Sequence, residues 1–299
     1  MRTPFTGVGT ALITPFTKSG ALDEGAVKAL ARRQVDNGIH FLVPCGTTGE
    51  TPTLSAAERR RVVELVLEAA NGKVPVMAGA GGYDTQEVVH VAREMHSIGV
   101  QGLLSVTPYY NKPTPEGLYA HFSKIAEAIN LPVLLYNVPG RTGCNIDATT
   151  CAKLATIPKV IGVKEASGNI TQMVEVVKAV PSDFLVLSGD DALTVPLMSI
   201  GGRGLISVAS NSIPAEMVKM VEAAERGDYA AARTQHQRLV PMMLGNFMES
   251  NPCPVKYAMS VMGLCELSFR LPMVPPRPAS QEKMRALLKE LGIESAVHH

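Results

Sequence analysis

Lys164 stands in the segment VIGVKEAS, a run that is otherwise rich in Val, Ile and Gly. Burial in such a run disfavours the charged ammonium, and a neutral amine can attack a carbonyl carbon to form a Schiff base. The structural alternative is that Lys164 caps a strand and pairs with Glu165 at its rim. Lys164 is therefore a candidate nucleophile, and the residues around it determine whether it can act as one.

Tyr136 and Arg141 stand in LLYNVPGRTG, the first at the tip of an apolar run and the second in the loop beyond it. A phenol can transfer protons, and a guanidinium can hold a carboxylate through two parallel hydrogen bonds. The alternatives are a core tyrosine with a satisfied hydroxyl and an arginine on the surface. Both interpretations stay open on these residues alone.

Two loops carry further candidates. PCGTTGET contains Thr47 and Thr48 between glycines, and such a turn can hold a small carboxylate through backbone amides and a helix N-terminus, although loops of this composition are often only structural. TPYYNKPTPEG places Tyr109 and Tyr110 together, where adjacent aromatic residues line a pocket or, as we favour, a contact between subunits.

Eight short apolar runs that alternate with amphipathic stretches of helical period must position these groups. Their near-continuous apolar character predicts parallel strands buried on both faces under helices. The count predicts an α/β fold, a (β/α)8 TIM barrel with its chemistry at the carboxyl ends of the strands. A doubly wound sheet is the alternative, but no G-x-G-x-x-G follows the first run. The expected strands span residues 9–16, 41–45, 74–79, 102–107, 132–137, 160–165, 184–188 and 204–208.

The helical stretches have recognisable ends. In SAAERRRVVELVLEAANG, Ser55 and Glu58 have capping-box spacing, and Gly72 is expected to stop the helix. After the last strand we expect helices near 213–247, 251–264 and 280–294, the first including the eighth barrel helix, with LPMVPPRPAS as an extended connector. The prediction is a catalytic barrel over residues 1–227 and a C-terminal helical extension over 228–299 packed on it.

Composition excludes several classes of function. Among 299 residues, 28 Lys plus Arg face 27 Asp plus Glu, so the net charge of +1 favours neither nucleic acid nor an anionic membrane as partner. No apolar run approaches the roughly 18 residues of a membrane span, and MRTPFTGVGT lacks the features of a signal peptide. We therefore expect a cytoplasmic protein.

The residues that commonly bind metals do not form a site in the sequence. The five cysteines are scattered without C-x-x-C spacing, the histidines show no ligand spacing, and Asp190 and Asp191 should point to opposite sides of one strand end. Cys45 and Cys144 flank candidate loops without a nearby histidine, so we do not expect them to be nucleophiles. His298 and His299 are interpreted as a tail or tag remnant. The expectation is no metal and no disulfide.

Several motifs together resemble one family along nearly the whole chain and in the same order: GTTGE, TPYYNKP, YNVPGRTG, GVKEASG, SGDD and GGRGLISV are similar to the dihydrodipicolinate synthase family. The wider superfamily of pyruvate-dependent class I aldolases, which includes N-acetylneuraminate lyase and keto-deoxy sugar acid aldolases, shares part of this set. Arg141 in the P-G-R-T-G loop and the paired threonines of GTTGE favour the synthase.

The resemblance implies a role for each group around the nucleophile. Lys164 would form an imine with pyruvate, and the resulting enamine would attack an aldehyde. Tyr136 would be the general acid and base, linked through the hydroxyl of Thr47 to Tyr110 of a neighbouring subunit. Three hydroxyls would then make one proton relay.

The remaining site residues are implied to bind substrate. Thr48 and the amides of its turn would hold the pyruvate carboxylate, and Arg141 would receive the carboxylate of aspartate semialdehyde. Gly189 and Ile206 match positions whose backbone lines the imine pocket. GGRG precedes the eighth strand, at the opposite end of the barrel, and is assigned to a tight turn rather than to a phosphate site.

The implied reaction joins pyruvate and L-aspartate 4-semialdehyde into 4-hydroxy-tetrahydrodipicolinate, the first committed step of lysine and diaminopimelate biosynthesis. The imine supplies the electron withdrawal, so no cofactor is expected. A borrowed Tyr110 implies a homotetramer built as a dimer of dimers. The alternatives are an aldolase or lyase of a sugar acid, which keeps Lys164 and Tyr136, and a non-catalytic carboxylate-binding barrel, which need not keep the relay.

Members of this family often bind lysine as a feedback inhibitor at a subunit interface. Tyr109 and Glu87 match that site. Ala56 stands where inhibited relatives tend to carry histidine, and Tyr83 stands where they often have asparagine. A lost partner would weaken binding by about 1 to 3 kcal/mol, so we expect inhibition by lysine to be impaired.

Overall fold

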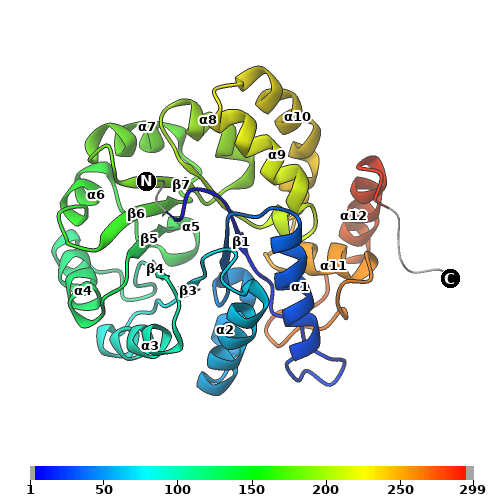
Figure 1. Ribbon diagram of the computed structural model, residues 1–299, viewed down its shortest axis with the longest axis horizontal. Coiled ribbons are helices and arrows are strands. Elements are labelled where there is room, and N and C mark those ends of the chain that lie inside the picture. Colours follow the sequence, from blue (N-terminus) through cyan, green and yellow to red (C-terminus); the bar gives the residue numbers. More distant parts are fainter. Residues whose placement is uncertain (1–3, 294–299) are drawn as a thin grey trace.

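The computed structural model describes residues 4–293, which form one ring of eight parallel strands surrounded by helices (Figure 1). The strands pair in the order β2-β1-β8-β7-β6-β5-β4-β3, and a parallel bridge between Leu42 and Val76 brings the two ends of the sheet together. The (β/α)8 barrel prediction is confirmed. The strands are β1 (Gly7–Ala11), β2 (Phe41–Val43), β3 (Met77–Gly79), β4 (Gly102–Val106), β5 (Val133–Asn137), β6 (Val160–Glu165), β7 (Leu185–Ser188) and β8 (Gly204–Ser207).

All eight expected strands are present, and the first differs most from its prediction. The sequence predicted 9–16, whereas β1 begins at Gly7 beside Gly204 and ends at Ala11 beside Val43. Ile13, beyond the end of β1, is buried for another reason, because it packs against Val255 of the C-terminal extension. An apolar run indicates that residues are buried, but it does not show whether their backbone pairs with another strand. The predicted strand therefore ended too late in the sequence.

The major helices follow the strands in alternation. Those up to the eighth barrel helix are α1 (Glu24–Asp36), α2 (Ala56–Ala70), α3 (Thr85–Ile98), α4 (Pro115–Ala128), α5 (Pro139–Thr142), α6 (Ala148–Leu154), α7 (Ile170–Ala179), α8 (Thr194–Ser199) and α9 (Pro214–Glu225). The capping box at the start of α2 is confirmed, because Ser55 and Glu58 each accept from the other's backbone amide. The helix ends one residue before expectation, at a left-handed Asn71 rather than at Gly72.

Two apolar layers account for the alternation within the strands. One fills the barrel and includes Phe41, Leu134, Tyr136, Leu187 and Ile206. The other, much larger layer lies between the strands and the helices. Successive strand residues serve opposite layers, which is why each run is apolar throughout.

The chain after the barrel contains α10 (Tyr229–Gly245), α11 (Cys253–Val261) and α12 (Pro278–Glu290), which lie on one side of the barrel near α9 and α1 (Figure 1). The single stretch expected near 213–247 is two helices, because the chain turns at a left-handed Gly227. The expected connector lacks helix and strand over residues 271–277, while its last three residues form the start of α12. The domain boundary at 227/228 stays a prediction, and His298 and His299 lie outside the described residues.

Within residues 4–293, no helix has the length and apolar character needed to cross a membrane.

His121 on α4 couples the stability of the barrel to pH. Its side chain is buried, its Nδ1 lies 2.9 Å from Thr85 Oγ1, and burial lowers its pKa from 6.5 to about 4. Between these two pH values the unfolded chain binds the proton and the native state does not, so stability falls as pH falls from 6.5 to 4. His121→Gln should remove about 2 to 3 kcal/mol of this pH-dependent loss in urea unfolding curves.

The matched control for this pH dependence is His90→Gln on the exposed face of α3. Equal pH slopes for His121→Gln and the wild type between pH 6.5 and 4 would contradict the assignment of this loss to His121.

Candidate active site

Lys164 and Tyr136 are direct partners on the adjacent strands β6 and β5. The Nζ of Lys164 lies 4.1 Å from the centroid of the Tyr136 ring, and the two residues are 5% and 8% exposed. Paired positions on neighbouring strands face the same side of a sheet, so both side chains enter the barrel interior near its carboxyl end. The arrangement places a buried amine beside the ring of a buried phenol, a pair that can carry out imine chemistry.

Glu165 does not pair with Lys164, so the structural alternative for the lysine is not what the fold contains. The Glu165 carboxylate is fully buried and accepts hydrogen bonds from Asn137 Nδ2 at 2.8 Å, Ser167 N at 2.7 Å and Gln172 Nε2 at 3.3 Å. Consecutive strand residues point to opposite faces. Glu165 therefore anchors the outer layer and leaves Lys164 to the interior.

Gly189, just after β7, leaves space for the lysine side chain. A Cβ at this position would lie 3.1 Å from Lys164 Cε, 3.2 Å from its Cγ and 2.5 Å from Ala166 Cβ. The backbone of Gly189 also donates to Glu165 O at 2.7 Å, which holds it against β6. A side chain at this position would overlap Ala166 Cβ and crowd Lys164, which would have to shift by a few tenths of an ångström.

Gly189→Ala should lower the rate of imine formation with pyruvate by about tenfold, because the new Cβ overlaps Ala166 and crowds the nucleophile, and small misplacements of a reacting group have effects of this size. Borohydride trapping at a series of pyruvate concentrations measures the rate. Gly140→Ala, where a Cβ would meet nothing within 4 Å, is the control. A Gly189→Ala protein that reacts at the wild-type rate would show that Lys164 does not need this space.

Asp191 orders the wall of the site that contains Ile206. Its buried carboxylate accepts from Ser207 Oγ at 2.5 Å, Val208 N at 3.1 Å and Ala209 N at 3.3 Å. These donors follow Ile206, a buried residue of β8 that the family resemblance places at the imine pocket. Burial raises the pKa of Asp191 to about 6, against the effect of its hydrogen bonds.

The turn after β2 presents Thr47 and Thr48 on a short 3-10 helix, Thr47–Gly49. Thr47 is half-buried, and Thr48 is 3% exposed. The Oγ1 of Thr48 accepts a hydrogen bond of 2.9 Å from Asn251 Nδ2, from the segment before α11.

Asn251 also contacts the loop of Arg141. The Arg141 side chain is exposed on α5, and its Nη2 donates to the Asn251 carbonyl oxygen at 3.4 Å. One residue of the extension thus links the two side chains that the sequence assigned to carboxylate binding. The sequence analysis did not identify Asn251, which reads as an ordinary polar residue of a loop.

Tyr110 lies apart from the other relay residues. Its side chain is 90% exposed, and its backbone has a φ of 69°. A ring this exposed cannot complete a relay inside its own barrel. The single chain therefore brings Lys164 and Tyr136 together and leaves Tyr110 free to contact another molecule.

The residues of the candidate lysine site are exposed. Tyr109 stacks edge to face on Tyr83, with ring centroids 5.1 Å apart and planes at 83°. Burial and the neighbouring Tyr83 raise the pKa of Tyr109. Glu87 is exposed on the first turn of α3, and Ala56 is exposed at the start of α2.

The remaining polar residues near these loops have structural partners. Burial raises the pKa of Cys45 to about 12 and raises that of Cys144, so neither thiol supplies a thiolate at neutral pH. Asp190 accepts from Ala192 N at 2.9 Å, while Asp191 bonds elsewhere. Among residues 4–293, no three His, Cys, Asp or Glu side chains gather as metal ligands.

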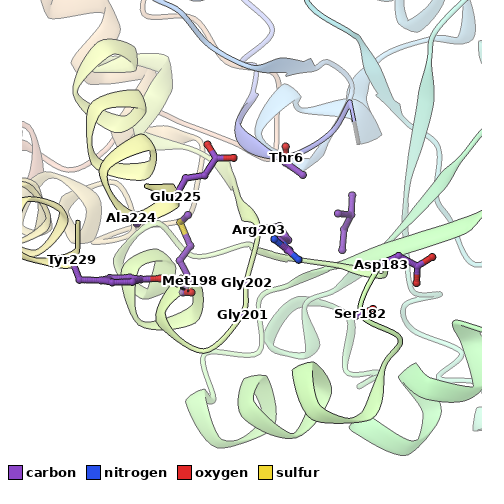
Figure 2. A pocket seen from close by; sticks show the side chains of 11 residues that line it. Thr6, Ser182, Asp183, Met198, Gly201, Gly202, Arg203, Ala224, Glu225 and Tyr229 are labelled. Carbon is purple, nitrogen blue, oxygen red and sulfur yellow. Dashed lines mark hydrogen bonds between the residues drawn. The ribbon is translucent and has the colours of Figure 1, made fainter. Parts of the chain in front are cut away.

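A surface pocket of about 450 Å³ lies at the other end of the barrel (Figure 2). Thr6 before β1, Asp183 before β7 and Arg203 before β8 line it, so it opens at the amino ends of the strands. The GGRG segment forms its wall as a turn, as predicted, and a Cβ on Gly204 would lie 1.9 Å from Gly7 O. The pocket therefore opens at the end of the barrel opposite to Lys164, and neither Lys164 nor Tyr136 lines it.

Comparisons show that the chain is similar to one family of known proteins along nearly its whole length. A model of the dihydrodipicolinate synthetase family matches residues 4–291. The 4-hydroxy-tetrahydrodipicolinate synthase of Koribacter versatilis is 51% identical over 288 residues, covering 96% of each chain. A crystal structure of dihydrodipicolinate synthase from Thermotoga maritima has a TM-score of 0.96 and 43% identity, covering 97% of this chain and all of the other. A lysine-bound structure from Cyanidioschyzon merolae has a TM-score of 0.95 and 39% identity, covering 98% and 100%.

Proposed function

The chain belongs to the dihydrodipicolinate synthetase family, and on this premise we propose that it condenses pyruvate with L-aspartate 4-semialdehyde to give 4-hydroxy-tetrahydrodipicolinate. It is a lyase of this family, acting at the first committed step of lysine and diaminopimelate biosynthesis. The observation that carries the proposal is the Lys164 amine held 4.1 Å from the Tyr136 ring inside the barrel.

The first half of the reaction activates pyruvate. The Nζ of Lys164 attacks the keto carbon, Tyr136 transfers the protons, and water leaves as the imine forms. The imine draws electrons from the adjacent methyl, which loses a proton to give the enamine. Thr48 and the amides of its turn hold the pyruvate carboxylate during these steps.

The second half forms the new bond and releases the enzyme. The enamine carbon attacks the aldehyde, whose oxygen takes a proton and becomes the hydroxyl of the product. The amino group of the second substrate then attacks the imine carbon and displaces Lys164, which closes the ring. Arg141 orients the second substrate through its carboxylate, and the backbone at Gly189 and Ile206 lines the imine.

Because the imine itself withdraws electrons, the reaction as proposed needs no cofactor. Both substrates are small soluble acids, which supports a cytoplasmic location.

We extend the proposal to a homotetramer built as a dimer of dimers, in which Tyr110 enters the neighbouring site and joins Thr47 and Tyr136. The 90% exposure of Tyr110 supports this arrangement. Sedimentation velocity at assay concentrations tests it, because a fully active monomer would leave the relay without its third hydroxyl.

Regulation by lysine is expected to be weak. The Tyr83 ring packs on Tyr109 where inhibited relatives often have asparagine, and Ala56 offers no polar group. Ala56→His with Tyr83→Asn should lower the lysine concentration for half-inhibition by ten- to a hundredfold, as restored hydrogen bonds would predict. Equal inhibition of the wild type and this double variant would show that Ala56 and Tyr83 are not the reason for weak inhibition by lysine.

The test of the function supplies pyruvate with aspartate semialdehyde and follows the cyclic product through an added NADPH-dependent reductase. Turnover by the wild type establishes the reaction. If pyruvate is trapped on Lys164 by borohydride but aspartate semialdehyde is not consumed, the chemistry stands and sugar-acid substrates replace the proposed aldehyde. Absence of any adduct on Lys164 would overturn both enzymatic proposals and leave a carboxylate-binding barrel.

A further inference from the structure

A buried ion pair joins the C-terminal extension to the turn after β2. Lys256, in the first turn of α11, has its Nζ 2.6 Å from Glu50 Oε1, and the exposed fractions of the two side chains are 0% and 1%. Glu50 is the last residue of the GTTGE motif. The pair thus spans two segments 206 positions apart in the sequence.

The surroundings satisfy both charges without solvent. Lys256 Nζ also donates to Thr14 O at 3.0 Å and lies 4.5 Å and 4.8 Å from the ring centroids of Phe16 and Phe269. The second oxygen of Glu50 accepts from Arg270 N at 3.3 Å. Removing one partner would leave a buried charge uncompensated, whereas removing both charges is often neutral for stability.

The pair is directly continuous with the candidate substrate-binding turn. Glu50 has a left-handed backbone with a φ of 51°, and its amide donates to Thr47 O at 3.1 Å. Thr14, whose carbonyl oxygen holds Lys256, donates its own hydroxyl to Gly49 O at 2.7 Å. The backbone of Glu50 and the residue Thr14 therefore connect the ion pair directly to the turn that carries Thr47 and Thr48.

A buried ion pair contributes little net stability compared with apolar packing, and it is stable only when the two charged groups are held in a well-defined geometry. We propose that Lys256 and Glu50 are positioning residues for pyruvate recognition, which hold the Thr47–Thr48 turn at the distance from Lys164 that the carboxylate of the imine requires. This inference rests on the proposed function, in which Thr48 and the turn amides bind that carboxylate.

The test uses two variants that separate charge from position. Glu50→Gln combined with Lys256→Met removes both charges, and Glu50→Asp keeps both charges but shortens the link by one methylene group. Each should raise the pyruvate concentration for half-maximal borohydride trapping on Lys164 by roughly tenfold, while turnover at saturating pyruvate changes by less than about threefold. The single variant Lys256→Met should be much less stable to urea than the double variant.

Glu58→Gln is the matched control, because the Glu58–Arg270 ion pair, with 2.6 Å between Oε1 and Nη2, also joins the extension to the barrel but does so on α2. It should lower stability and leave pyruvate half-saturation unchanged. If the double variant and Glu50→Asp fold and trap pyruvate with wild-type half-saturation, the ion pair is only structural. Failure of the wild type to form any adduct is a separate result, which would overturn the proposed function instead.

Discussion

Lys164→Ala is expected to abolish pyruvate trapping and to lower turnover by at least about a thousandfold, because the variant lacks the amine that forms the imine and loss of a covalent nucleophile has effects of this size or larger. The folded protein should persist, since the substitution shortens one side chain and leaves the β5–β6 pairing intact. Mass analysis after borohydride reduction, together with the coupled assay, measures both effects.

Lys153→Ala provides a matched control for the nucleophile. Its Nζ also lies over a tyrosine ring, 5.4 Å from the centroid of Tyr119, but outside the barrel on α6. This variant should keep its adduct and its activity. Substantial turnover by Lys164→Ala, or an adduct that maps to another lysine in the wild type, would disprove the Schiff-base mechanism at this residue.

Tyr136→Phe is expected to lower kcat by about a hundredfold to ten-thousandfold, the range for loss of a general acid or base. Phenylalanine keeps the ring that faces Lys164 and removes only the hydroxyl. The imine should therefore form slowly and still be trapped by borohydride, while the rate of bond formation with the aldehyde collapses. Single-turnover measurements separate the two steps.

Tyr119→Phe is the corresponding control, because it removes a hydroxyl from the other tyrosine that faces a lysine. It should leave kcat unchanged. If Tyr136→Phe kept more than about a tenth of the wild-type kcat, another group would have to carry the proton, and the relay through Thr47 and Tyr110 would lose its centre.

The sequence predicted much of the fold because the signal for it is local. A strand buried on both faces has to be apolar along its length, and a helix on the barrel has to be apolar on one face, so the two patterns alternate visibly. The errors occur where residues are buried without belonging to a strand, or where a helix ends at an unexpected residue type. Ile13 lies beyond the end of β1 and is buried against the extension, and a left-handed Asn71 ended α2 where glycine was expected.

The sequence also identified Lys164 and Tyr136, because a polar residue at the end of an apolar strand is conspicuous in a barrel whose chemistry lies at the carboxyl ends. It did not identify Asn251, Lys256 or the importance of Glu50. These residues read as ordinary polar positions of a loop and a helix, and their burial depends on packing between segments about 200 residues apart.

The sequence by itself determined the eight strands, their order and the chemical types at their ends, because hydrophobic periodicity and strand-end position are properties of short segments. Only the tertiary structure decided that Lys164 lies beside Tyr136, that Glu165 turns away from both, and that Gly189 leaves room for the lysine. Strand register and side-chain packing determine such contacts, and both arise when the whole ring closes. The link from the extension to the Thr47–Thr48 turn likewise depends on packing between distant segments and could not be predicted from the sequence.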